Sequence, residues 1–232
     1  MVEGRVPTLP SRLAVAALSL ALGGVMLALA LPRIAAELAA LPGNRIEAAV
    51  EHGQLPGDAE LALLVQSREG SLAWLVSGRT EMELAVAELL LARDDLGGGE
   101  WNRSRRAQAE AMFRAGLARA PADPYGWARL AHLSLIEGAP PRQVVPLLEM
   151  SLRTAPVEPP LTLARLELCL VEWNYFDASA APQLEAQLRL AWAEAPDALV
   201  RLVRATGRVD LLQSALPQDK QAALQRRLAA SP

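Results

Sequence analysis

Three segments of this 232-residue chain end in the same way, and this shared ending restricts the fold more than any other feature. FRAGLARAP ends at Pro121, LEMSLRTAP at Pro156 and LRLAWAEAP at Pro196. In each, a bulky apolar residue is followed three positions later by a small one, then by another bulky one, and Ala-Pro closes the segment. Small residues let helices cross closely, bulky ones fill the neighbouring groove, and proline ends a helix. The pattern predicts an all-α fold, an array of antiparallel helical hairpins over residues 58–232.

The clearest unit of this array, Pro121 to Pro156, resembles a tetratricopeptide repeat. Its two closing prolines are 35 residues apart, close to the roughly 34-residue period of that family. A stretched copy ends 40 residues later, at Pro196. The matching positions are Ala109-x3-Phe113, Gly116 and Pro121; Trp127-x2-Leu130-Ala131, with Ala131 where the family prefers Gly; Val144-x3-Leu148, Ser151 and Pro156; and Leu184-x3-Leu188, Ala191 and Pro196. The resemblance implies stacked helical hairpins, with a polar helix after Pro217 capping the array.

An uncharged run of 19 residues, Leu13–Leu31, predicts a transmembrane helix. At ~1.5 Å per residue it spans about 28 Å, close to the ~30 Å hydrocarbon core of a bilayer. Arg5 and Arg12 precede it, which favours a cytoplasmic N-terminal tail at residues 1–12. The alternative is a cleaved signal peptide with Ala28-Leu29-Ala30 as its cleavage site. Either interpretation carries the rest of the chain across the membrane.

Residues 32–57 are expected to form juxtamembrane helices and a linker. Pro42-Gly43-Asn44 is expected to end one helix, with Asn44 capping a short second one. Beyond them, Asp58 is expected to cap the next helix and Gly70-Ser71 to begin another. We expect that helix to end at Gly78 and its successor to begin at Thr80, because Thr80 and Glu83 have the spacing of a capping box.

Charge and residue usage exclude several classes of function. The net charge is −3, so a basic face for nucleic acid is not expected. Cys169 is the only cysteine, which rules out an internal disulfide. We expect a small buried apolar residue; an intermolecular disulfide or a reactive thiol is the alternative. His52 and His132 stand in separate segments without a paired carboxylate. We therefore expect no enzyme activity, no metal site and no cofactor; an envelope enzyme on a helical scaffold is the least favoured alternative.

The candidate partner-binding residues lie on two predicted helices. Tyr125, Arg129 and His132 fall at i, i+4 and i+7, hence on one helix face. In tetratricopeptide repeats the first helix of each unit lines a groove that binds peptides, so the resemblance implies a ligand-facing stripe. A similar polar stripe is formed by Thr162, Arg165, Cys169 and Glu172. The alternative for both stripes is an ordinary solvated helix face.

Three aromatic residues follow the second stripe, in the segment Trp173-Asn174-Tyr175-Phe176. The first expectation is that they pack in the core beneath the connection over residues 174–182. The alternative is an exposed contact for a protein or a glycan, with Trp173 as a partner-binding residue.

The whole layout resembles small membrane-bound repeat proteins of bacterial envelope-assembly systems. The order of short tail, anchor and helical array implies a non-catalytic scaffold or adaptor in the bacterial inner membrane, single-pass, with its N-terminus cytoplasmic and its body periplasmic. The resemblance extends to proteins that accompany polysaccharide polymerisation and export. Helpers of cytochrome maturation, of secretion or of the translocon share the layout and remain alternatives. The expected partners are envelope proteins and, through one helix, the membrane.

Overall fold

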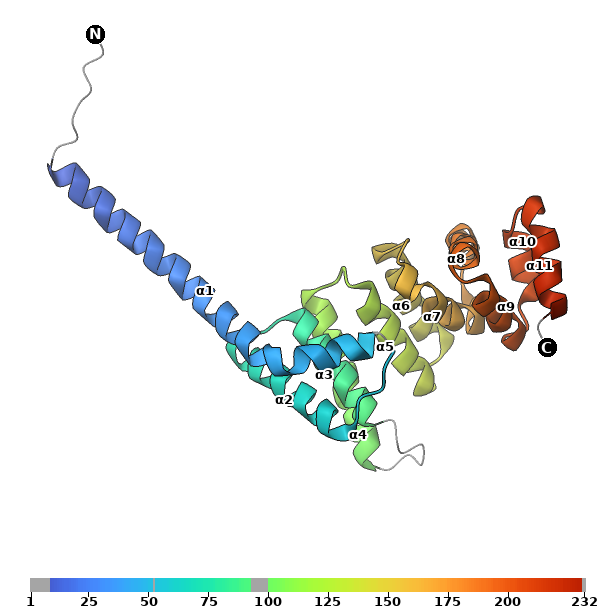
Figure 1. The fold of residues 1–232 in the computed structure, drawn as a ribbon, viewed down its shortest axis with the longest axis horizontal. Coiled ribbons are helices and arrows are strands. Elements are labelled where there is room, and N and C mark those ends of the chain that lie inside the picture. Colours follow the sequence, from blue (N-terminus) through green and yellow to red (C-terminus); the bar gives the residue numbers. More distant parts are fainter. Residues whose placement is uncertain (1–8, 52, 93–99, 231–232) are drawn as a thin grey trace, which may run out of the picture. The chain divides into compact units, whose positions relative to one another are not determined.

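The computed structural model describes residues 9–51, 53–92 and 100–230, and every regular element in these ranges is helical (Figure 1). The chain forms two compact units, Met1–Gly97 and Gly98–Pro232. The domain boundary expected at residue 58 therefore falls inside the first unit. Residues 1–8 of the expected tail lie outside the described residues.

The first unit is built on α1 (Leu9–Glu51), a single helix of 43 residues. Its N-terminal half carries the apolar run, whose side chains are exposed from Leu13 to Leu29. The helix is long and apolar enough to cross a membrane. Two shorter helices follow: α2 (Asp58–Trp74) packs on the C-terminal half of α1, and α3 (Gly78–Leu91) packs on α2.

The helix stop expected at Pro42-Gly43-Asn44 is wrong, because α1 continues through it to Glu51. Proline removes one hydrogen bond from a helix, but packing against a second helix can offset that loss. Here α1 buries Ala36, Ala40 and Ile46. Asn44 does not cap a new helix; its side-chain oxygen instead accepts a hydrogen bond from Arg68 of α2 at 3.0 Å.

The helix ends expected within residues 58–80 also differ from the structure. α2 runs past Gly70 and Ser71 to Trp74, so no helix begins there. Gly57, rather than Asp58, is its N-cap, and the backbone N–H of Gly57 donates to the Glu60 carboxylate at 2.9 Å. α3 begins at Gly78, where the sequence predicted an end. Extended backbone at Leu75 separates the two helices and lets the chain turn without a glycine.

The second unit contains the remaining helices, which lie between Glu100 and Ala230. Five of them begin with proline at the first or second helical position, where its missing N–H costs nothing and its fixed φ suits the helix. Among these helices α5 packs mainly on α6, and α7 on α8. The elements are α4 (Glu100–Arg119), α5 (Pro124–Ile136), α6 (Pro141–Thr154), α7 (Pro159–Val171), η1 (Trp173–Tyr175), η2 (Ala178–Ala180), α8 (Ala181–Glu194), α9 (Pro196–Ala205), α10 (Val209–Ala215) and α11 (Gln218–Ala230).

The positions that define the repeated segments lie in the core of this unit. One apolar cluster joins α5, α6, α7 and α8, and a second joins α7 and α8 to α9, α10 and α11. The bulky and small residues of the sequence pattern are thus positions that pack in the interior. The members buried from the three segments are Phe113, Gly116 and Leu117; Leu148, Ser151 and Leu152; and Leu188 and Ala191.

Candidate functional site

The stripe predicted on α5 lies on the accessible side of that helix. Tyr125 and Arg129 are half-buried and His132 is exposed, while the opposite side of α5 is in the core. The Tyr125 hydroxyl donates a hydrogen bond to the Glu158 carboxylate, just before α7, at 2.8 Å. The Arg129 guanidinium lies 5.9 Å from the centroid of the Tyr125 ring. Ile136 extends the same face by one more turn and is 63% exposed.

The neighbouring helix α7 exposes the equivalent positions. The helices contact each other and begin at Pro124 and Pro159, an offset of 35 residues. The residues 35 positions after Tyr125, Arg129, His132 and Ile136 all lie on α7, and each of them is exposed. These residues are Pro160, Ala164, Glu167 and Val171. We call the eight residues of the two helices the α5–α7 face.

The second predicted stripe is wrong as a surface, because Thr162, Arg165 and Cys169 are fully buried. The polar pattern suggested a solvated face, but α7 is covered by its neighbours on that side. Thr162 is satisfied within its own helix, where its hydroxyl donates to the Glu158 carbonyl at 3.0 Å. Cys169 sits in the core beside Leu184 and Leu148, and burial raises the pKa of its thiol to about 12. The expectation of a small buried hydrophobe is thus confirmed for Cys169.

Arg165 ties three segments together from inside the second unit. One terminal nitrogen, Nη1, donates to the carbonyls of Ser151 at 3.0 Å and Ala155 at 2.9 Å. These carbonyls belong to the C-terminal end of α6; the Ser151 carbonyl also accepts from the Ala155 N–H, whereas the Ala155 carbonyl lies past the last helical residue. The other nitrogen, Nη2, donates to the Gln187 side-chain oxygen of α8 at 2.6 Å. Desolvation by burial lowers the pKa of Arg165 from its ordinary value.

Two further hydrogen bonds extend this contact. The Gln187 amide nitrogen donates to the Pro156 carbonyl at 2.6 Å, and the Ser151 hydroxyl donates to the Pro124 carbonyl at 2.8 Å. The Ala-Pro ending of α6 is therefore held by α7 and α8, and α6 is held to the start of α5. Arg165 stabilises the arrangement of helices and does not face a partner.

Glu172 and Trp173 are also less accessible than a partner-binding role requires. Glu172 is 6% exposed, and its Oε2 atom has no hydrogen-bond partner among the described residues. Trp173 packs against both apolar clusters of the unit, as the core interpretation of the aromatic segment predicted. Tyr175 differs from it, since its ring is largely exposed.

Sequence reasoning missed a buried charged cluster in the first unit. The Arg68 side chain is 1% exposed and contacts the Glu47 carboxylate of α1 and the Glu83 carboxylate of α3, the latter at 2.7 Å. It also donates to the Ala40 carbonyl at 3.0 Å. Arg79 adds a contact with Glu83 at 2.6 Å from the exposed side. One guanidinium thus joins all three helices, and no local motif marks a contact between residues this far apart.

The pKa of Glu83 is raised from its ordinary value of 4.5 to about 7. The main cause is desolvation by burial, followed by the side-chain hydrogen bond with Glu47; Arg79 and Arg68 act in the opposite direction. Two carboxylates that compete for one guanidinium favour a shared proton. Glu83 is therefore the group of this cluster that can change charge near neutral pH.

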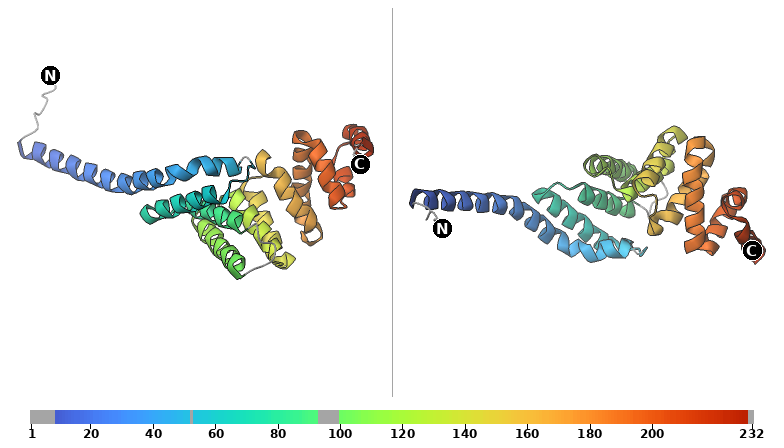
Figure 2. Two further views of the ribbon diagram at one scale, coloured as in Figure 1. Left: turned by 60° about the horizontal axis from the view of Figure 1, so that its bottom comes forward. Right: turned by 90° about the horizontal axis from the view of Figure 1, so that it is seen from above.

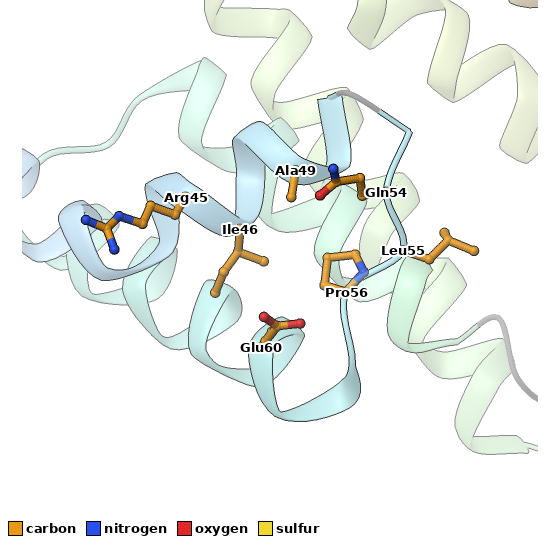
Figure 3. Close-up of a pocket in the computed structure, with 7 residues that line it drawn as sticks. All are labelled: Arg45, Ile46, Ala49, Gln54, Leu55, Pro56 and Glu60. Atoms are coloured by element: carbon orange, nitrogen blue, oxygen red, sulfur yellow. The ribbon is translucent and has the colours of Figure 1, made fainter.

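A shallow hollow lies between the last turns of α1, the connection that follows and the start of α2 (Figure 3). Its volume is about 180 Å³, below the ~300–1,000 Å³ of typical ligand pockets. Ile46 and Pro56 form its apolar wall. The Glu60 carboxylate at its edge accepts a hydrogen bond from the backbone N–H of Gly57. Among the residues that the structure describes, no three His, Cys, Asp or Glu side chains come together in a way that could hold a metal ion.

No protein-family model, curated protein or solved structure matches this chain. The functional argument therefore rests on the surfaces that the helices present.

Proposed function

We propose that this chain is a membrane-tethered scaffold of helical hairpins that binds a protein partner through the α5–α7 face. In this proposal the apolar half of α1 spans the bacterial inner membrane, the N-terminus is cytoplasmic, and the rest of the first unit and the whole second unit are periplasmic. The proposal is supported by an exposed apolar helix at one end of the chain and, in the second unit, by a face that two adjacent helices offer at equivalent positions.

The composition of the α5–α7 face carries the proposal. Tyr125, Arg129 and His132 provide aromatic and basic groups, and Ile136 and Val171 add exposed apolar side chains. Relative to the rest of a protein surface, aromatic residues and arginine are enriched at interfaces, and lysine, glutamate and aspartate are depleted. Glu167 places one carboxylate beside these groups. A partner segment with apolar side chains and at least one acidic residue near Arg129 would complement this face.

The repeated positions also favour an extended partner. A period of 35 residues presents Arg129 and His132 on one helix and Ala164 and Glu167 on the next. Repeat arrays use such series of equivalent positions to bind peptides along their length. Within the envelope, polysaccharide polymerisation and export is the system that the sequence resemblance favours, and the partner would be a protein of that machinery.

Site-specific crosslinking in membranes tests the proposal. A photo-reactive phenylalanine derivative replaces His132 or, in a second variant, Glu167. The matched control carries it at Gln143, an exposed residue on α6. We expect the same envelope protein to be captured from positions 132 and 167 and not from 143, and Arg129→Glu to reduce that capture. Arg142→Glu, a charge reversal at an exposed position of α6, is expected to leave it unchanged.

Equal capture from all three positions, or capture that Arg129→Glu leaves intact, would overturn the binding role of the α5–α7 face. The tether is tested separately with a reporter fused after Pro232. Alkaline phosphatase fused there should be active and a cytoplasmic fluorescent reporter dark; the reverse pattern would refute the periplasmic location.

A further inference from the structure

An exposed apolar segment ends α2 in the first unit. Trp74 is 61% exposed, Leu75 38% and Val76 55%, so three consecutive large apolar residues face solvent. No charged residue lies between Glu69 and Arg79. Isolated exposed apolar side chains are common, but three in succession at a helix end are unusual for a water-exposed surface. Their position along α1 indicates what covers them.

α2 runs antiparallel to α1, and close contacts define the register of the pair. Near the C-terminal end of α1, Ile46 packs with Leu64. One turn earlier, a Cβ atom on Gly43 would lie 2.1 Å from the Ser67 hydroxyl oxygen. Earlier again, a Cβ atom on Gly70 would lie 3.6 Å from the Ala39 side chain. α2 therefore returns along α1 toward the apolar half of that helix, and its C-terminal end lies beside α1 (Figure 1, Figure 2).

This register sets the height of Trp74 relative to the apolar run. Trp74 is four residues beyond Gly70, which places it opposite Ala35 on α1, four residues before Ala39. Ala35 is in turn four residues beyond Leu31, about 6 Å along the axis at ~1.5 Å per residue. The headgroup region of a bilayer extends about 5–8 Å beyond each edge of the hydrocarbon core. If Leu31 marks that edge, the Trp74 ring lies among the headgroups.

We propose that the segment Trp74–Val76 inserts into the lipid interface beside the point where α1 leaves the membrane. Tryptophan is enriched at this depth because its ring is apolar and its N–H can still reach water or headgroups. Leu75 and Val76 would reach toward the acyl chains. The inference rests on the proposed membrane span of α1 and adds a second contact between the first unit and the bilayer.

The surroundings of the segment fit lipid. Exposed apolar side chains of α1 continue beyond Leu31 with Ile34, at the same height as the end of α2. Arg33 is exposed at this height and can reach phosphate groups, as arginine does near the ends of membrane helices. Lipid would therefore cover Trp74–Val76 and the adjacent surface of α1 together.

Quenching by brominated lipids tests the proposal with the full chain reconstituted in phosphatidylcholine vesicles. Bromine quenches tryptophan only over short distances, so it reports rings within the bilayer. Wild-type fluorescence should fall when brominated phosphatidylcholine replaces the ordinary lipid. Trp74→Phe should lose most of that lipid-dependent quenching while keeping an apolar ring. The matched control is Trp101→Phe, which removes a tryptophan that is 59% exposed in the other unit and should leave the quenching intact.

Extraction with alkaline carbonate distinguishes a failure of the interfacial segment from a failure of the proposed membrane span of α1. Protein that resists extraction but shows no quenching, or quenching that persists in Trp74→Phe, overturns the interfacial segment and leaves the span standing. Protein released by carbonate and unquenched overturns both. Circular dichroism of each variant checks that the helices are retained.

Discussion

Replacing Arg165 by methionine should destabilise the second unit, although methionine is apolar and can replace the aliphatic part of the arginine side chain. Arg165→Met removes three hydrogen bonds, to the carbonyls of Ser151 and Ala155 and to the Gln187 side chain. The Ala155 carbonyl and the Gln187 oxygen lose a charged donor in a water-poor site. The Ser151 carbonyl keeps the bonds that it accepts from the Thr154 hydroxyl at 3.2 Å and from the Ala155 N–H at 3.3 Å.

Two opposing contributions determine the size of the effect. Hydrogen bonds from a charged donor contribute about 1.5–3 kcal/mol each, or roughly 5–9 kcal/mol for the three. Burying a guanidinium costs several kcal/mol, and the lowered pKa of Arg165 reflects that cost. Methionine recovers the desolvation cost and loses the hydrogen bonds. The net loss in the free energy of unfolding should therefore be about 2–4 kcal/mol.

Urea unfolding of the full chain in detergent, followed by tryptophan fluorescence, measures this loss, because Trp173 and Trp192 are partly buried against the core of the second unit. Arg142→Met is the control, since Arg142 is exposed on α6 and its replacement should change stability by less than about 0.5 kcal/mol. The double variant Arg165→Met with Gln187→Leu should lose less than the sum of the single variants, because removing both partners leaves fewer unpaired groups. Equal stability of Arg165→Met and Arg142→Met would refute the role of Arg165 in holding α6 to α8.

Three further predictions concern other buried positions. The pKa of Glu83 is about 7 in the folded chain and ordinarily 4.5, so the folded state binds the proton more tightly than the unfolded state. Protonation of Glu83 therefore stabilises the fold fully below about pH 4.5, and this stabilisation is lost as the pH rises through 7. Glu83→Gln should flatten this dependence, measured by thermal unfolding across the pH range; an unchanged slope would contradict it. Gly43→Ala should lower the free energy of unfolding by about 1–2 kcal/mol, because the new Cβ atom would lie 2.1 Å from the Ser67 oxygen. Gly70→Ala should be neutral or stabilising, because its Cβ atom would lie 3.6 Å from the nearest neighbour. Thermal melts of the two variants measure this difference. Cys169 should react with a thiol reagent only after urea unfolding, since the thiol is buried and its pKa is raised to about 12; rapid reaction of folded protein would show that the core around it opens.

The helices of the second unit could be predicted because their sequence pattern and their packing agree. Phe113, Leu148 and Leu188 recur before a small residue, and each is fully buried at a helix contact. Proline also marks the start of five helices, where local chemistry alone restricts the backbone. In these segments the tertiary structure reinforces what the local sequence favours.

The polar stripe of α7 shows why the candidate site was predicted only in part. Tyr125 and His132 are polar and accessible, whereas Thr162 and Arg165 are polar and buried. Helical spacing reveals which residues share a face and says nothing about what covers that face. Arg165 is satisfied by carbonyls at the end of α6, which no residue pattern in α7 could disclose.

The first unit was misread where long-range contacts override local signals. Pro42, Gly43 and Asn44 together favour the end of a helix, yet Arg68 on α2 donates hydrogen bonds to that turn of α1 and holds it in place. Gly70 does not end α2 and has room for a methyl group, since its nearest neighbour, the Ala39 side chain, would be 3.6 Å away. Gly43 has no such room, because a Cβ atom there would lie 2.1 Å from the Ser67 oxygen. Glycine serves here for close approach of two helices, and the same residue in a sequence equally indicates a loop.

The unbroken course of α1 has a geometric consequence for the first unit. Each residue of a helix advances about 1.5 Å and turns about 100°. Because α1 extends from the apolar run to Glu51 without a loop, the number of residues after Leu31 sets the direction in which α2 and α3 face around the axis of the apolar half of α1. One residue inserted at Arg33 would turn these helices by more than a quarter of a circle and shift them along the axis by little more than an ångström. The orientation of α2 and α3 relative to the apolar run therefore depends on the exact number of residues between them.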